Sequence, residues 1–351
     1  MRAKNSLEFL TSLRGIAALW VVLYHIKIYL IDFIPLSAVQ FISKGYLAVD
    51  FFFVLSGFII AMSYQNKINL LDSATITVFF KKRIARIYPL HCFMLLLYMV
   101  IPIAYYFYDK SLPSQSLYSI ENFILSLFLI NNWGFNSGLS WNIPSWSIST
   151  EFAAYLLFPT LTLLFKYKSR FIYVLYILVS VSILQYVFFM ENTASIGGSI
   201  SQLSLLRCII EFFIGMCVWN IYKLTPGFSK IKSLLLFFIS TLIYIGIFSG
   251  YLQEVFFIPL ALVLLLFSLV TFNDKVRLNF LFNPVLIYLG EISYSIYLSH
   301  YFIKDIFKII FLDQHGASLV WIISYLLTVI IFSMITYKYI EQPMRVKIGA
   351  K

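Results

Sequence analysis

Residues 253–272 read QEVFFIPLALVLLLFSLVTF, a run of twenty residues with one charged side chain, Glu254. One helical crossing of a bilayer needs about 20 mostly apolar residues, so this run is long enough to span a membrane. The whole chain of 351 residues is similar, with 61% hydrophobic and 12% charged residues. These values exclude a soluble globular domain, which averages about 25% charged residues, and also a disordered, collagen-like or nucleic-acid-binding chain. We therefore predict an all-α fold, a polytopic transmembrane helical bundle with about ten transmembrane helices.

Ten runs of this kind follow one another along the chain. The predicted spans lie near 9–31, 46–64, 88–108, 146–165, 171–190, 202–222, 233–250, 253–272, 284–310 and 318–339. Residues 119–133, within the long loop 109–145, are short for a span, and whether they are re-entrant stays open. The first run has no cleavage site and no soluble domain is apparent at either end. We therefore expect a retained first helix and a single integral-membrane domain over 1–351.

The distribution of Lys and Arg predicts the orientation of these spans. If the N-terminus is cytoplasmic, 20 of the 26 Lys and Arg residues fall in cytoplasmic segments and five in external ones. Polytopic proteins carry this excess on the cytoplasmic side, which accounts for the net charge of +11 without a nucleic-acid partner. We expect a multi-pass protein of the cell inner (cytoplasmic) membrane with both termini in the cytoplasm.

Eight ionisable side chains of the predicted spans are candidate functional residues, because an ionisable group at mid-membrane costs about 2.5–3.5 kcal/mol on insertion scales. They are Arg14, His25, Asp50, Glu151, Arg207, Glu211, Glu291 and His300. The eleven residues from Arg14 to His25 make three helical turns plus about 20°, or about 16 Å along the axis. Both side chains therefore share one helix face, with Arg14 near the cytoplasmic surface and His25 in the outer half. A snorkelling Arg14 and a hydrogen-bonded packing His25 are the open alternative.

Three ionisable residues from three predicted spans share the depth of the outer half. Asp50 opens the second span, and Glu151 lies in the fourth, which enters the bilayer from outside. Ser147, Glu151 and Tyr155 are spaced four residues apart and form one polar stripe on a helix. We therefore expect His25, Asp50 and Glu151 to converge. Asp50 as a helix N-cap and Glu151 as a structural hydrogen-bonding residue are the open alternatives.

A basic segment, TITVFFKKRIARIYP at 75–89, precedes the third span. Its apolar side chains follow helical spacing, and its polar side chains are Lys81, Lys82, Arg83 and Arg86. Two interpretations stay open. The segment is either an interfacial helix on anionic lipid or a site for phosphate groups, whose oxygens match the fork of an arginine.

Two further polar sets each lie on a single predicted helix. Arg207 and Glu211 are four residues apart, and we expect them chiefly to neutralise each other within the membrane. Ser293, Tyr297 and His300 form a polar stripe in the ninth span, which fits the wall of a cavity. The alternative for His300 is a buried packing residue.

The motifs, taken in order, resemble those of the membrane-bound acyltransferase-3 family. The matching segments are LRGIAALWVVLYH (13–25), GYLAVDFFFVLSGFII (45–60), KKRIARIYP (81–89), WSISTEF (146–152), RCIIEFFIG (207–215), SYSIYLSH (293–300) and YIEQP (339–343). They cover nearly the whole chain, and Ala48 departs from the glycine that is frequent in the family. Many members carry a soluble esterase-like domain after the last span. This chain, which stops at Lys351, resembles the stand-alone type.

The resemblance implies an enzyme, an O-acetyltransferase that moves an acyl group, usually acetyl, from acyl-coenzyme A to a hydroxyl. The expected acceptor is a cell-surface glycan or its lipid-linked precursor, and the expected partners are this donor, this acceptor and the lipid bilayer. Arg14, His25, Glu151 and the pair Arg83 and Arg86 fall on the family's functional positions. In the mechanism that we expect, His25 is the general base and Glu151 orients its imidazole.

The candidate residues therefore fall into three predicted sets. The catalytic set is His25, Glu151 and Asp50. The donor-binding set, at the cytoplasmic face, is Arg14, Lys82, Arg83 and Arg86. The acceptor-binding set, in which aromatic rings suit stacking on a sugar, is Trp146, Ser147, Tyr155, Tyr297 and His300. We expect no metal, because the three cysteines, Cys92, Cys208 and Cys217, lie in apolar runs without paired spacing.

The main competing function is a secondary transporter or a flippase for a lipid-linked glycan, with the buried charges as a proton relay. The sequence shows neither a strong internal repeat nor many Gly or Pro breaks within the spans, and both are frequent in transporters. A structural or sensory protein is the third possibility, and it would not require the buried charges. Consumption of acyl-coenzyme A discriminates among these functions. Direct and two-step acyl transfer both stay open.

Overall fold

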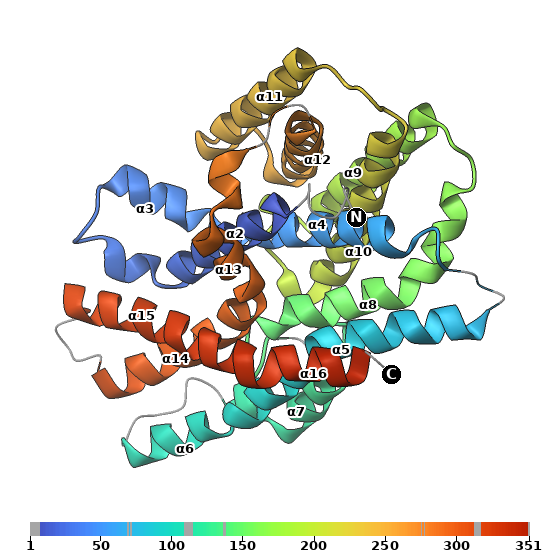
Figure 1. Ribbon diagram of the computed structural model, residues 1–351. Helices are drawn as coiled ribbons and strands as arrows, with labels where there is room; N and C mark the ends of the chain where they lie inside the picture. The colour runs from blue at the N-terminus through green and yellow to red at the C-terminus, as the bar shows by residue number, and fades with distance from the viewer. Residues whose placement is uncertain are drawn as a thin grey trace.

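The structure is a computed structural model that describes residues 8–68, 70, 72–108, 115–135, 138–274, 276, 278–311 and 317–349. Throughout these residues the chain forms helices and no β-strand (Figure 1). The α-helices are α2 (Phe9–His25), α3 (Leu36–Ser43), α4 (Ala48–Tyr64), α5 (Ser73–Leu97), α6 (Val100–Phe107), α7 (Ile120–Leu127), α8 (Ser145–Leu161), α9 (Arg170–Met190), α10 (Ile200–Lys223), α11 (Lys230–Phe248), α12 (Glu254–Asn273), α13 (Pro284–Glu291), α14 (Ser293–Phe311), α15 (Leu319–Thr336) and α16 (Gln342–Gly349). The predicted all-α class is confirmed.

Eight helical segments in the described part of the chain are long and apolar enough to cross a membrane. They are Leu36–Tyr64, Ser73–Phe107, Ser145–Phe165, Arg170–Met190, Ile200–Lys223, Lys230–Phe248, Glu254–Asn273 and Leu319–Gly349. α2 is apolar but shorter, with 17 residues. The predicted ninth span is divided at Ile292 into α13 and α14. The chain is a polytopic membrane bundle, and the boundaries of the individual spans stay predictions.

The basic segment 75–89 and the predicted third span belong to one helix, α5. The side chain of Asp72 accepts a hydrogen bond from the backbone N–H of Ala74 at 2.9 Å and caps the start of α5. The helix then continues through Pro89 to Leu97, although proline removes one backbone hydrogen bond from a helix interior. The arginines of the segment are therefore carried on the same helix as the apolar run that follows them.

A close contact between α4 and α10 forms the centre of the bundle. In Figure 1, α2, α4 and α10 run through the middle, α11 and α12 lie above them, and α14, α15 and α16 lie below. A Cβ at Gly57 would overlap the carbonyl oxygen of Phe212, and a Cβ at Gly215 would overlap that of Val54. Small residues allow membrane helices to approach in this way. The two glycines therefore fix the position of α4 against α10.

We expect Gly57→Ala to lower the thermal unfolding midpoint of the detergent-solubilised protein, because the added Cβ would meet the backbone of α10. Overpacking of a tight interior costs about 1–3 kcal/mol, and a backbone neighbour cannot move aside as a side chain can. Gly138→Ala is the matched control, since no atom lies within 4 Å of a Cβ built there. Equal midpoints for the two variants would contradict the close contact.

Candidate functional site

A cavity of about 120 Å³ lies between α2, α4, α5, α8 and α14. Its polar lining includes Arg14, Arg83, Arg86, Glu151, Tyr155 and Tyr297. Ser147, Glu151 and Tyr155, which the spacing of four residues predicted to form one stripe of α8, all line this cavity. Periodicity within one helix therefore identified one wall of the site correctly.

Glu151 connects α8 to α4 through hydroxyl groups, and Arg83 of α5 lies close by. Its Oε1 accepts hydrogen bonds from Ser56 Oγ at 2.5 Å and from the hydroxyl of Tyr155 at 2.6 Å. Arg83 donates a hydrogen bond to the hydroxyl of Tyr64 at 3.2 Å. The guanidinium carbon of Arg83 lies 6.0 Å from the ring centroid of Tyr155. Glu151 and Arg83 therefore share Tyr155 as a neighbour, and three helices meet at this point.

A second hollow adjoins the cavity, and its lining includes four cationic side chains, Lys82, Arg83, Arg86 and Arg345, which we call the basic mouth. Arg83 and Arg86 line both hollows, so the basic mouth and the cavity lie side by side. α5 and α16, which are distant in the sequence, pack against each other here (Figure 1). Arg345 was not among the predicted site residues. Its one signal in the sequence is a spacing of four residues from Glu341.

Glu341 is a buried carboxylate beside the basic mouth, and the sequence analysis gave it no role beyond a family motif. It ends a π-helical turn, Tyr337–Glu341, and wide turns of this type are frequent at functional sites. Ser295 Oγ donates to Glu341 Oε2 at 3.0 Å, and Arg345 Nη1 lies 3.6 Å from Oε1. Glu341 also interacts electrostatically with Arg86. It therefore offsets part of the positive charge that collects here.

His25 and His300 come together beyond the cavity. His25 is the last residue of α2, and its ring centroid lies 5.1 Å from that of His300 and 5.1 Å from that of Tyr301. His300 is 0% exposed, and its Nδ1 lies 2.7 Å from the carbonyl oxygen of Tyr297. Arg14 lines the cavity, whereas His25 is not among the described residues that line it. The two residues thus mark separate regions along α2.

The predicted contact between Glu151 and His25 is wrong. The carboxylate of Glu151 is held in the cavity by the hydroxyls described above, while His25 packs against His300. Tyr297 lies between the two regions, because its hydroxyl hydrogen-bonds Ser147 Oγ at 2.8 Å and its ring centroid lies 5.9 Å from that of His300. Depth in the membrane, which the sequence indicated, does not determine how a helix is rotated about its own axis.

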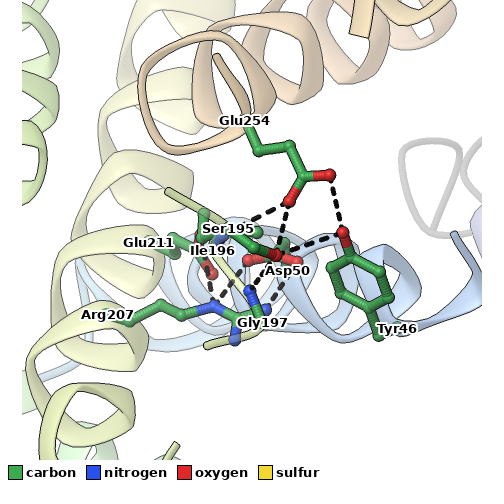
Figure 2. Close-up of polar contacts among 8 residues, drawn as sticks. All are labelled: Tyr46, Asp50, Ser195, Ile196, Gly197, Arg207, Glu211 and Glu254. Atoms are coloured by element: carbon green, nitrogen blue, oxygen red, sulfur yellow. Dashed lines mark hydrogen bonds and ion pairs between the residues drawn. The ribbon is translucent and has the colours of Figure 1, made fainter. Parts of the chain in front are cut away.

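Asp50 is also not a neighbour of His25, because it forms an ion pair with Arg207 (Figure 2). Arg207 Nε donates to Asp50 Oδ1 at 2.7 Å, and Arg207 Nη2 lies 2.6 Å from Oδ2. Glu211 Oε1 lies 4.0 Å from Arg207 Nε. The prediction that Arg207 and Glu211 chiefly neutralise each other therefore needs correction. The main partner of Arg207 comes from α4, and all three side chains are buried.

A second polar cluster, centred on Glu254, lies next to this pair (Figure 2). Glu254 Oε1 accepts a hydrogen bond from the hydroxyl of Tyr46 at 2.6 Å and pairs with Lys44 Nζ at 2.5 Å. Glu254 Oε2 accepts from Ser195 Oγ at 2.8 Å and from the backbone N–H of Ile196 at 3.3 Å. Both oxygens are satisfied, so the cluster ties the start of α12 to the residues before α4 and α10.

Trp146, predicted to stack on a sugar, is only 7% exposed. Its ring centroid lies 6.0 Å from that of Phe53 and 5.8 Å from the guanidinium carbon of Arg207. The ring is therefore packed in the core against these neighbours, and little of its surface is left for stacking on a sugar. This corrects the predicted role of Trp146 as an open surface for the acceptor.

The arrangement offers two chemically distinct regions, the guanidinium groups at the cavity and the histidine pair beyond it. The basic mouth and Arg14 present guanidinium groups, which bind phosphate and carboxylate oxygens through paired N–H donors. The histidine pair presents imidazole nitrogens, which can accept or donate a proton during a reaction. Among the residues that the structure describes, no three His, Cys, Asp or Glu side chains gather as metal ligands would. An anionic ligand of the guanidinium groups and a group that contacts the histidine pair would thus be held apart from each other.

Nearly the whole chain is similar in sequence to bacterial proteins named as O-acetyltransferases. O-acetyltransferase OatA of Staphylococcus aureus strain NCTC 8325 is 26% identical over 382 residues, which cover 99% of this chain and 58% of that protein. OatA of strain COL matches with the same identity and coverage, so the chain spans a little over half the length of these curated relatives. No solved structure gave a significant match. Residues 7–338 match the family described as Acyltransferase domain, and the chain belongs to this family.

Proposed function

We propose that this chain is an integral-membrane O-acetyltransferase that transfers an acyl group, most simply acetyl, from acyl-coenzyme A to a hydroxyl. The acceptor is a cell-surface glycan or its lipid-linked precursor. The observation that carries the proposal is the convergence of Arg14, Arg83 and Arg86 on one cavity that adjoins the basic mouth. The family and the name of the OatA relatives support the reaction class.

The charge of the basic mouth suits the nucleotide end of acyl-coenzyme A, which is a polyanion. Arg14, Arg83 and Arg86 are partly buried, and like charges repel one another more strongly there than they would in bulk water. Glu151 and Glu341 are the carboxylates that the described contacts bring to this region, and they are fewer than the cations. Bound phosphates would relieve the remaining repulsion. An excess of arginine is therefore expected of a phosphate site and is not expected of ordinary helix packing.

The acyl arm of the donor would extend from the basic mouth through the cavity towards Tyr297. Phe52, Ile59 and Ser147 are among the uncharged side chains that line this path. Such a lining accepts an uncharged arm, whereas the charged phosphates would stay with the arginines. In this arrangement the thioester lies near Tyr297, and the acceptor approaches from the side of His25.

His25 would act as the general base for the transfer. It takes the proton of the acceptor hydroxyl while the hydroxyl oxygen forms a bond to the carbonyl carbon of the thioester. The bond between that carbon and sulfur then breaks, and the proton passes to the sulfur, so that an ester and free coenzyme A are released. A positioned base contributes about 10²–10⁴-fold to such a rate. Glu151, hydrogen-bonded to Tyr155, would hold the donor-binding end in place instead of orienting His25.

The proposed orientation puts the basic mouth on the cytoplasmic side of the inner membrane, where acyl-coenzyme A is available. Two observations support it. α5 and α16, whose charges the Lys and Arg distribution assigns to the cytoplasm, pack together at the mouth. His25 lies with Tyr301 and near Lys304, which the same distribution assigns to the outside. We also propose that 1–351 forms one membrane domain.

We expect Arg83→Gln and Arg86→Gln each to raise the apparent KM for acetyl-coenzyme A by about 10- to 100-fold, since a hydrogen bond to a charged group contributes about 1.5–3 kcal/mol. Labelled acetyl-coenzyme A is supplied to membranes of the native host, and label in the glycan fraction is measured against donor concentration. The control is Arg170→Gln, an exposed arginine at the start of α9 that we also expect to face the cytoplasm. An unchanged KM in both variants would remove the basic mouth from donor binding.

We expect His25→Gln to lower labelled acetyl transfer by about 10²–10⁴-fold, because the general base is lost. The apparent KM for acetyl-coenzyme A should stay within a few-fold of wild type, since His25 lies beyond the cavity that would hold the donor. The matched control is His91→Gln, in which a buried histidine bonded to the carbonyl oxygen of Ser126 is replaced. Wild-type transfer by the His25 variant would contradict the assignment of the base.

The same assay separates acyl transfer from transport. A transporter or flippase with a proton relay consumes no acetyl-coenzyme A, so the glycan fraction of wild type and deletion strain would carry equal label. That result would overturn the proposed function, whatever the outcome for individual residues.

A further inference from the structure

The hydrogen bonds of His300 determine which of its ring nitrogens carries a proton. Nδ1 lies 2.7 Å from the carbonyl oxygen of Tyr297 and 3.2 Å from that of Ile296. Carbonyl oxygens only accept hydrogen bonds, so Nδ1 must be the donor. In the neutral imidazole Nε2 then carries a lone pair and is an acceptor.

Nε2 of His300 is buried and has no hydrogen-bond partner among the described residues. A buried polar atom without a partner is uncommon, and it calls for an explanation. His91 also has one ring nitrogen without a hydrogen-bond partner, so this feature alone does not distinguish His300. What distinguishes His300 is the ring of His25, whose centroid lies 5.1 Å away with an angle of 35° between the ring planes.

His25 needs an acceptor of this kind. A general base uses the lone pair of one ring nitrogen, and the N–H of the other nitrogen must be held in a fixed direction. Within the described ranges His25 makes ring contacts with Tyr24, His300 and Tyr301. Asp305, a nearby carboxylate, has its Oδ1 3.9 Å from Lys304 Nζ. The lone pair of His300 is thus an acceptor on a ring that lies against that of His25.

The separation of the two rings also suits a hydrogen bond between them. A nitrogen lies about 1.1 Å from the centroid of an imidazole ring, and an N–H hydrogen bond spans about 2.9 Å between heavy atoms. Two imidazoles joined in this way therefore have centroids about 5 Å apart when their nitrogens face each other. The observed centroid separation of 5.1 Å matches this value.

We propose that His300 is a positioning residue for His25: its Nε2 accepts a hydrogen bond from the N–H of His25 and so directs the lone pair of His25 to the acceptor hydroxyl. The inference rests on the proposed function, in which His25 is the base. It gives His300 the role that the sequence analysis assigned to Glu151. The backbone carbonyls of α14 hold His300 itself in the tautomer that this role requires.

Two substitutions at one position test the proposal. His300→Leu removes the acceptor atom, and His300→Gln keeps a side-chain oxygen that can accept a hydrogen bond. We expect His300→Leu to lower the maximal rate of labelled acetyl transfer by about 10- to 100-fold, less than the full contribution of a base. We expect the maximal rate of His300→Gln to lie closer to wild type. Its fold-loss, expressed as a logarithm, should be smaller than that of His300→Leu by at least a third. The apparent KM for acetyl-coenzyme A should stay within a few-fold of wild type in both.

The assay uses host membranes with labelled acetyl-coenzyme A, and rates are normalised to folded protein measured by gel filtration in detergent. His91→Gln is the matched control for replacing a buried histidine. A purely structural role predicts that His300→Gln is no better than His300→Leu and that donor KM changes with them. That pattern, or a wild-type maximal rate in His300→Leu, would overturn the proposal.

A double variant separates this inference from the proposed function. If His300 acts through His25, then His25→Gln with His300→Leu is no slower than His25→Gln alone. Additive losses would show that His300 acts independently of His25. If wild-type membranes transfer no label, or if His25→Gln transfers it at the full rate, then it is the proposed function that fails.

Discussion

The ion pair between Asp50 and Arg207 joins α4 to α10, and the position of the cavity depends on this connection. Two contacts of 2.7 and 2.6 Å hold the carboxylate against the guanidinium group, and the exposed fractions of the side chains are 0% and 2%. Removal of one partner from such a buried pair costs about 3–5 kcal/mol, because the other charge is left without compensation. With α4 held in this position, Ser56 hydrogen-bonds Glu151, and Tyr64 accepts a hydrogen bond from Arg83 of the basic mouth.

Relations within single helices could be predicted from the sequence. The long apolar runs identified the all-α class, because only helices satisfy every backbone hydrogen bond within one segment in lipid. A spacing of four residues put Ser147, Glu151 and Tyr155 on one side of α8, and all three line the cavity. Arg14 and His25 occupy separate regions of α2, as three turns of helix require. Each of these inferences uses the period of the helix alone.

Contacts between helices could not be predicted in this way. Arg207 pairs with Asp50, 157 residues away, although the spacing favoured Glu211 on its own helix. Glu151 contacts Ser56, 95 residues away, and not the histidine that lies on α2. Depth in a bilayer follows from distance along a helix, whereas rotation about the axis follows from the packing of the partner helices. The sequence therefore predicted which polar residues lie within the membrane helices. The packing of the helices determines which of these residues contact one another.

The carboxylates beside the basic mouth set the balance between repulsion among its cations and attraction for an anionic ligand. Without any carboxylate, the cations would repel one another whenever the phosphates are absent. With one carboxylate for each cation, little positive charge would remain to attract a polyanion. Glu341, held by Ser295 and close to Arg345, compensates part of the charge from a buried position beside the mouth. In the proposed function, partial compensation would reduce the repulsion in the empty site and would leave attraction for the phosphates of the donor. A buried carboxylate would provide it without occupying the place of the phosphates.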